Sequence, residues 1–449
     1  MKTLIANGTL VFSDHRLNAN LLIDGEQIGY IGPDRPITDT IIDANGCYLM
    51  PGFIDTHTHL ELSHGLFGQD TEAAAQGGCT SVLEFATQVR GDTMLHGFEK
   101  WMQYAKNSTT NYGFHMSLSE WNDRQLQQLD EMDRLGVTSY KMYMVYDGLK
   151  VDDGEIYAAL KAIKQHGAIL GVHCENWDLL NRIADEVFQA GYHTAVGHPM
   201  SRPAPVEAEA ISRFLRIAQL AEAPAYIVHL STKEGLLEIL RARERGQEVY
   251  VETCPQYLLL TDDAYATDEG VKYIMSPPLR NKADNEALWQ ALSDGTIDTI
   301  GTDHCSFFMA EKLKHADDFR LVPNGCAGLQ HRAQLIYTYG VCQERISLER
   351  MVALLSTNPA KLFGIADRGE LYTGKVADLV IWDPSYRGQI TNTNHHHNCD
   401  NSIYSGLPVQ GMARDVFING LPVIRNGELV SHVQGKYLHR VRGEHYRHQ

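Results

Sequence analysis

The sequence predicts an α/β protein: a (β/α)8 barrel of the TIM type with a small β-sandwich domain built from both termini. Two features of the 449 residues predict it. Between residues 51 and 367, short apolar stretches alternate with longer amphipathic ones, as in parallel strands joined by helices. Toward both ends, short alternating stretches are bounded by turn dipeptides. The predicted domains are therefore residues 1–50 and 368–449 for the β-sandwich and tail, and 51–367 for the barrel.

The two terminal segments are each too small to bury a core alone, so we expect them to pair. Strands are expected at 3–6, 9–12, 20–23, 27–31, 378–382, 413–418 and 421–424. Asn7-Gly8, Asp24-Gly25 and Asn419-Gly420 are typical hairpin turns between them.

Eight apolar stretches are the expected strands of the barrel, and their number fits its length. They are residues 48–59, 80–86, 113–119, 138–145, 168–175, 225–231, 248–255 and 296–304. Helices are expected among the connections at 206–219, 233–245 and 348–355.

Composition argues against several classes of protein. With 39 lysine and arginine residues against 56 aspartate and glutamate residues, the formal net charge is −17. That charge disfavours non-specific binding to nucleic acid or to an anionic membrane. No apolar stretch approaches the ~20 residues of a membrane span, and no signal peptide is recognisable. The 8 cysteines form no Cys-x-x-Cys pair. We therefore expect a cytoplasmic protein.

Histidine is unusually frequent, at 21 residues, and several histidines stand at predicted strand ends. His57 and His59 are two positions apart on a strand, so their side chains project from the same face. His173 and His229 each end another strand, and Asp303 follows the last one. Barrels of this kind place reactive groups at these ends. Imidazole and carboxylate together suit zinc, and also manganese, iron or nickel.

Lys141 lies within an apolar strand, where an ammonium is costly to bury. Metal ions nearby would favour the neutral amine, which can react with CO2 to form a carbamate that bridges two metals. The alternative is a lysine whose ammonium reaches water at the strand end.

Nine segments of the chain resemble the cyclic amidohydrolases, the family of hydantoinase and dihydropyrimidinase. They are PGFIDTHTH at 51–59, YKMY at 140–143, GVHCE at 171–175, IVHLS at 227–231, ETCPQYL at 252–258, SPPLR at 276–280, TDHC at 302–305, NPA at 358–360 and ADLVIWDP at 377–384. They span nearly the whole chain, so the resemblance is specific.

The resemblance implies a barrel of the amidohydrolase type, a homotetramer and a centre of two divalent ions, by expectation zinc. One ion would be held by His57, His59 and Asp303, the other by His173 and His229, with carboxylated Lys141 between them. The implied reaction is attack on a cyclic amide carbonyl by a hydroxide shared between the metals.

The resemblance also implies roles around the substrate. Asp303 would accept the proton of the attacking water and return it to the departing ring nitrogen. Tyr146 would donate to the developing oxyanion; its alternative is a buried core tyrosine. Ser276 and Asn324 would hold the amide and carbonyl edges of the ring, or would serve only as turn formers.

Within the family, the residues favour hydantoinase, with dihydropyrimidinase next. The segment 60–64 lacks the arginine that dihydroorotase would place there, and segment 82–86 lacks the Met-Pro typical of allantoinase. Tyr146 also favours this branch. Two alternatives stay open: an allantoinase-like ureide hydrolase, and a non-catalytic tetrameric relative that acts as a binding protein. The second predicts missing ligands, whereas all six positions are filled.

Two segments affect specificity or remain unassigned. The stretch after His59 is short for the family, and its apolar residues predict a lip for an aromatic or bulky 5-substituent, or else pack on neighbouring loops. They are Leu60, Leu62, Leu66 and Phe67. A preference for the D-enantiomer is expected from the resemblance alone. The histidines at 395–397 are expected in a solvated loop, where they could bind a metal loosely.

Overall fold

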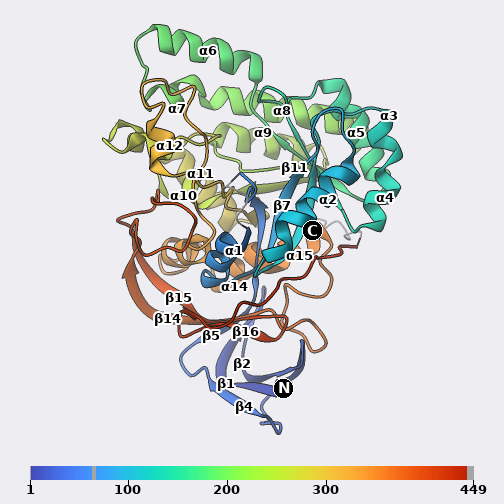
Figure 1. Cartoon of the computed structure of the whole chain (residues 1–449), viewed down its shortest axis with the longest axis vertical. Coiled ribbons are helices and arrows are strands. Elements are labelled where there is room, and N and C mark those ends of the chain that lie inside the picture. The colour runs from blue at the N-terminus through green and yellow to red at the C-terminus, as the bar shows by residue number, and fades with distance from the viewer. Residues whose placement is uncertain (1, 63–66, 442–449) are drawn as a thin grey trace.

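The computed structural model describes residues 2–62 and 67–441. Figure 1 shows a barrel wrapped by helices and, beside it, a sheet that contains strands from both ends of the chain.

The barrel consists of eight parallel strands hydrogen-bonded in chain order. They are β6 (Phe53–Thr58), β7 (Cys79–Thr87), β8 (Asn111–Ser117), β9 (Ser139–Tyr143), β10 (Ile169–His173), β11 (Ala225–Ile227), β12 (Val249–Thr253) and β13 (Thr299–Ile300). A parallel bridge between Thr58 and His304 joins the end of β6 to the segment after β13. The predicted barrel class is confirmed, and all eight expected stretches contain a strand.

Helices cover the outside of the barrel. They are α1 (Phe67–Gln76), α2 (Met94–Tyr104), α3 (Asp123–Gln127), α4 (Leu129–Arg134), α5 (Asp153–Gln165), α6 (Trp177–Gln189), α7 (Gly197–Ser201), α8 (Ala204–Ala221), α9 (Lys233–Glu244), α10 (Pro255–Leu259), α11 (Lys282–Ser293), α12 (Met309–Leu313), α13 (Arg332–Ile336), α14 (Leu348–Val352) and α15 (Asn358–Phe363). Local capping explains several starts; for example, the Asp152 side chain accepts from the Glu155 backbone N–H at the start of α5.

The termini form one nine-stranded sheet. Its strands are β1 (Lys2–Val11), β2 (Arg16–Asp24), β3 (Gln27–Gly32), β4 (Thr40–Asp43), β5 (Tyr48–Pro51), β14 (Leu379–Gln389), β15 (Pro408–Ile418), β16 (Leu421–Arg425) and β17 (Glu428–Leu429). β5 pairs with β1 on one side and with β14 on the other, so it joins the N-terminal strands to the C-terminal ones. The predicted pairing of the two ends is confirmed.

The stretch 48–59, expected as one barrel strand, is divided at Gly52 between the two sheets. Pro51 has no N–H for a ladder. The Gly52 N–H donates to the Asp378 carbonyl, and a Cβ at Gly52 would lie 2.2 Å from Oγ1 of Thr80. The chain therefore passes from one sheet to the other at a point where only glycine fits.

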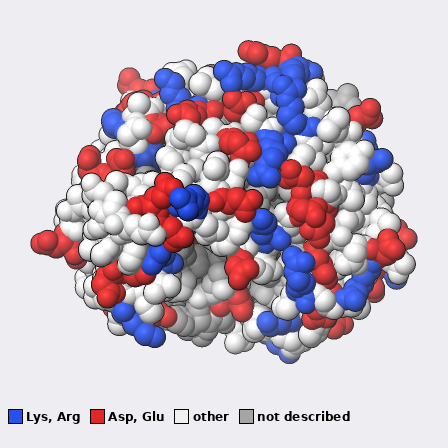
Figure 2. All heavy atoms as spheres, turned by 90° about the horizontal axis from the view of Figure 1, so that it is seen from above, with Lys and Arg blue, Asp and Glu red and all other residues white. Residues whose placement is uncertain are grey.

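The surface in Figure 2 carries acidic and basic side chains interspersed over the face in view. No helix within residues 2–62 and 67–441 combines the length and apolar character that crossing a bilayer requires.

Candidate functional site

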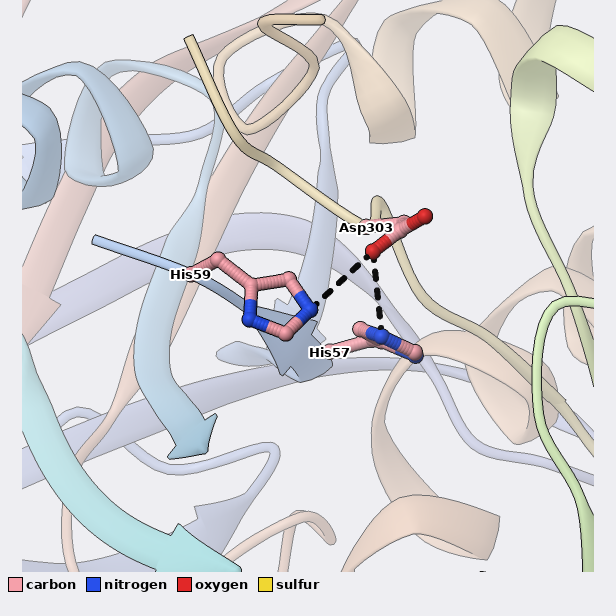
Figure 3. Close-up of side chains that lie close together, drawn as sticks. All are labelled: His57, His59 and Asp303. Atoms are coloured by element: carbon pink, nitrogen blue, oxygen red, sulfur yellow. Dashed lines mark ion pairs between the residues drawn. The ribbon is translucent and has the colours of Figure 1, made fainter. Parts of the chain in front are cut away.

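Three side chains meet around one oxygen atom at the carboxyl end of the barrel (Figure 3). His57 belongs to β6, His59 follows it, and Asp303 follows β13. Nε2 of His57 lies 3.1 Å and Nε2 of His59 lies 3.3 Å from Oδ1 of Asp303. One ligand atom from each residue lies within 4.8 Å of the others, a spacing that could hold a metal ion.

A second pair of imidazoles lies beside this group. His173 is the last residue of β10, and His229 comes shortly after β11. Nδ1 of His173 is 3.0 Å from Nε2 of His229, and the His229 ring centroid is 5.3 Å from that of His57. His229 and Asp303 both have left-handed backbone, with φ of 38° and 53°. Such conformations are rare outside glycine and gather at functional sites.

Lys141 on β9 lines the same cavity as these histidines. It is 1% exposed, and its Nζ lies 5.0 Å and 5.2 Å from the ring centroids of Phe85 and Tyr143. Burial lowers the pKa of Lys141 to about 8. The neutral amine is therefore more populated near neutral pH than in a free lysine, and the burial of Lys141 contradicts the alternative of an ammonium that reaches water.

Tyr146, Ser276 and Asn324 line the same cavity as the histidines. The Tyr146 ring is 5.2 Å from that of His173, and its backbone φ is 76°. The Ser276 hydroxyl donates to Oδ1 of Asn324 at 2.9 Å, which joins two loops. Burial raises the pKa of the Tyr146 phenol, so it keeps its proton at neutral pH.

All nine residues singled out in the sequence line a single cavity of about 450 Å³. They are His57, His59, Lys141, Tyr146, His173, His229, Ser276, Asp303 and Asn324. The barrel therefore brings together side chains from or just after five strands, and from two further loops.

The donor set fits metal ions. Four imidazoles, a carboxylate and an amine that can become a carbamate are ligands that zinc accepts. The buried Nε2 of His57 has its ion pair with Oδ1 of Asp303 and no hydrogen bond within the described residues, so a metal ion could take the place of its proton.

The electrostatics of the site favour positive charge near Asp303. Burial disfavours the His57 imidazolium, yet Glu252 and Asp303 outweigh it and raise the pKa of His57 to about 9. Burial would raise the pKa of Asp303, but His57 and His59 hold it well below the usual range. An ionised carboxylate facing imidazoles is the arrangement that attracts a cation.

Two buried glutamates contact these histidines, although the sequence reasoning assigned them no role. Glu252 accepts from His57, and Glu175 accepts from His173 and from Arg202. The available signal was an acidic residue within an otherwise apolar strand, for Glu252, or just after one, for Glu175.

Glu84, within β7, is a third buried glutamate and also lines the cavity. Its oxygens accept from Thr58 Oγ1 at 2.7 Å, from the Leu60 N–H at 3.0 Å, from the Glu61 N–H at 3.3 Å and from Trp101 Nε1 at 3.4 Å. Burial raises the pKa of Glu84 to about 8. This side chain ties the segment after β6 to β7.

The predicted apolar lip is only partly correct. Leu62 lines the cavity, but Leu60 and Phe67 are 0% and 1% exposed and belong to the core. The Leu60 backbone is held by Glu84, and Phe67 begins α1. Leu66 lies outside the described residues. The apolar wall comes instead from residues on other elements: Phe85, Val89, Trp101, Tyr143 and Leu149.

The histidine run at 395–397 lies in a loop, as expected, but it is not wholly solvated. His397 is 3% exposed, and its ring centroid is 5.2 Å from that of His304. Its Nε2 accepts the Gln330 N–H at 3.0 Å. Packing against the barrel removes this imidazole from water. The spacing of the histidines in the sequence does not indicate that packing.

This chain is similar in sequence to one family of known proteins. The model of the Amidohydrolase family matches residues 48–423. D-hydantoinase of Ralstonia pickettii is 38% identical over 98% of this chain and 99% of its own. D-phenylhydantoinase of Escherichia coli O1:K1 / APEC is 39% identical over 98% of each chain.

Solved structures give the same result. Dihydropyrimidinase from Brevibacillus agri NCHU1002 superposes with a TM-score of 0.96 at 37% identity, over 99% of each chain. L-hydantoinase (dihydropyrimidinase) from Arthrobacter aurescens superposes with a TM-score of 0.89 at 30% identity, over 96% of this chain and 97% of its own.

Proposed function

Since this chain belongs to the amidohydrolase family and is a cyclic amidohydrolase of the hydantoinase and dihydropyrimidinase type, we propose that it opens 5-substituted hydantoins or dihydropyrimidines. The products would be N-carbamoyl amino acids. The observation that carries the proposal is the single cavity lined by all nine predicted residues.

Two divalent ions, by preference zinc, would complete the site. His57, His59 and Asp303 would hold one ion, and His173 and His229 the other. Carboxylated Lys141 would lie between them: its neutral amine attacks CO2 and loses a proton, leaving an anionic carbamate. The lowered pKa of buried Lys141 supports this chemistry. When bound, such ions lower the pKa of a coordinated water and polarise a carbonyl.

The side chains of the protein would supply proton transfer and charge stabilisation. Asp303 faces both imidazoles through Oδ1, and its low pKa keeps it ionised and able to accept a proton. It would return that proton to the ring nitrogen as the C–N bond breaks. Tyr146, protonated at neutral pH, would donate to the carbonyl oxygen as negative charge develops on it.

Substrate binding would use the loops that Ser276 and Asn324 join. Their backbone and side-chain groups would face the amide and carbonyl edges of the ring. The apolar wall that includes Phe85 and Trp101 would hold a bulky or aromatic 5-substituent. This wall favours hydantoins with such substituents over unsubstituted dihydropyrimidines.

The test is elemental analysis of metal per chain on one sample that is also assayed with phenylhydantoin, dihydrouracil and allantoin. We expect about two metals and fastest opening of phenylhydantoin. Faster opening of allantoin would favour the ureide branch, and no hydrolysis after addition of zinc and bicarbonate would contradict the proposal. Light scattering on the same sample tests the predicted homotetramer.

A further inference from the structure

Two buried carboxylates each contact one imidazole of the site. Oε1 of Glu252 lies 2.6 Å from Nδ1 of His57, and Oε2 of Glu175 lies 2.7 Å from Nε2 of His173. An imidazole that ligates a metal is neutral and has one N–H, which the nitrogen beside a carboxylate carries. In the metal-bound state the other nitrogen of each ring would therefore direct its lone pair toward the remaining predicted ligands.

Glu252 contacts one residue from each of the two predicted ligand groups, His57 and His229. Besides His57, its oxygens accept from Oγ1 of Thr56 and from the Tyr226 hydroxyl, each at 2.6 Å, and from the His229 N–H at 3.3 Å. It is 0% exposed. Thr56, Tyr226 and the backbone amide are neutral donors, so they satisfy this carboxylate without offsetting its charge.

Glu175 has a different environment. Nη1 of Arg202 lies 2.6 Å from the same Oε2 atom that contacts His173. Both charged side chains are buried, at 0% and 8% exposure. The guanidinium therefore offsets the negative charge of Glu175 within a medium that screens it weakly.

We propose that Glu252 and Glu175 are positioning residues for the two halves of the metal centre, and that the half beside Glu252 retains its ion more strongly. This inference rests on the metal centre of the proposed function. The half that His57, His59 and Asp303 would form has the carboxylates of Asp303 and Glu252 nearby. In the half that His173 and His229 would form, the charge of Glu175 is balanced by Arg202. Coulomb attraction for a divalent cation is therefore greater in the first half.

The contacts also predict which half each glutamate supports. Glu252 touches His57 and the backbone of His229, so its loss affects both halves. Glu175 touches only His173 among the predicted ligands. Loss of the carboxylate that orients a ligating imidazole costs about 10- to 100-fold in metal affinity.

The experiment is metal release from the purified wild-type chain and from the variants Glu252→Gln and Glu175→Gln. Each is dialysed against increasing dipicolinate, and metal per chain is measured by mass spectrometry, with the visible spectrum of Co2+-loaded protein as a second readout. Wild type should release one ion before the other. Glu175→Gln should release the early ion at about 10- to 100-fold less chelator and keep the late one. Glu252→Gln should release both ions earlier.

Asp378→Asn is the matched control. It removes a buried carboxylate that contacts Nη1 of Arg368 at 3.1 Å, the Asn111 side chain and the Asn419 N–H, none of which belongs to a predicted ligand. It should release metal as wild type does. Glu252→Asp keeps the carboxylate but places it one methylene further from His57, so its metal release should shift by an intermediate amount. This variant tests the proposal even if Glu252→Gln does not fold.

Two results would overturn the proposal: release of both ions at one chelator concentration from wild type, or unchanged release from both Glu252 variants. A wild-type chain that takes up no divalent ion would instead contradict the proposed function itself.

Discussion

Nε2 of His57 and Oδ1 of Asp303 lie 3.1 Å apart, although they come from the first barrel strand and from the segment after the last. Three further contacts join these segments: the Thr302 N–H donates to Oδ1 of Asp55, the Thr302 hydroxyl donates to the His57 carbonyl, and the His59 N–H donates to the His304 carbonyl. The site therefore depends on closure of the barrel between β6 and β13.

Replacement of the buried lysine tests the proposed bridge. Lys141→Ala should lower metal content and remove most activity, because neither ion would keep a shared anionic ligand. Small carboxylic acids such as acetate should restore part of the activity by entering the vacated space. The buried Lys272, which pairs with Glu269 at 2.6 Å outside the cavity, gives the control Lys272→Met. Full metal content in Lys141→Ala would exclude the bridging role.

Removal of one hydroxyl tests the proposed oxyanion donor. Tyr146→Phe should lower kcat about 10²-fold, the scale of one lost donor, with the melting temperature unchanged. Tyr140→Phe is the matched control, since Tyr140 lies on β9 and its hydroxyl has no hydrogen-bond partner within the described residues. Equal kcat for the wild type and Tyr146→Phe would remove Tyr146 from the mechanism.

The side chain of Glu84 should contribute to stability through the four donors that its oxygens accept from. In Glu84→Ala these buried donors lose their acceptor whether or not the glutamate is protonated, so the free energy of unfolding should fall by about 1–3 kcal/mol. Denaturant unfolding measures this change. Glu61→Ala is the control, because only the Glu61 backbone takes part in the contact. A loss no larger than in the control would show that the four donors find other partners.

Stability should fall in mild acid because of a buried histidine that is not among the predicted ligands. Burial, with the Arg202 charge, lowers the pKa of His198 to about 3, and its Nε2 donates to the Met275 carbonyl at 2.7 Å. The unfolded chain, with a histidine pKa near 6.5, binds a proton that the folded chain refuses. Stability is therefore complete above pH 6.5 and lost as pH falls toward 3, by about 1.4 kcal/mol per pH unit.

The measurement is the melting temperature between pH 7.5 and pH 4.5. The decrease should be smaller in His198→Gln than in wild type. His96→Gln serves as control, because His96 is exposed on α2. Parallel curves for wild type and His198→Gln would assign the acid sensitivity to other groups.

The sequence predicted the barrel and most of the site because both depend on the pattern of residues within short segments. Alternation along each stretch marks a strand, and parallel strands joined by helices place their carboxyl ends at one face. Residues such as His57, His173 and Asp303 could therefore be assigned to one face before any contact was known. The division of segment 48–59 could not, because it depends on the close approach of Thr80 to Gly52.

The sequence alone determined which side chains lie at the strand ends. The tertiary structure decided which residues from other elements contact those side chains. The contacts of Glu252 with His57 and of Arg202 with Glu175 join residues from different elements. These contacts depend on the register between neighbouring strands and on how closely the helices pack. The spacing of residues within one segment determines neither. For the same reason Phe67 belongs to the core rather than the cavity, and His397 packs beside His304 rather than in water.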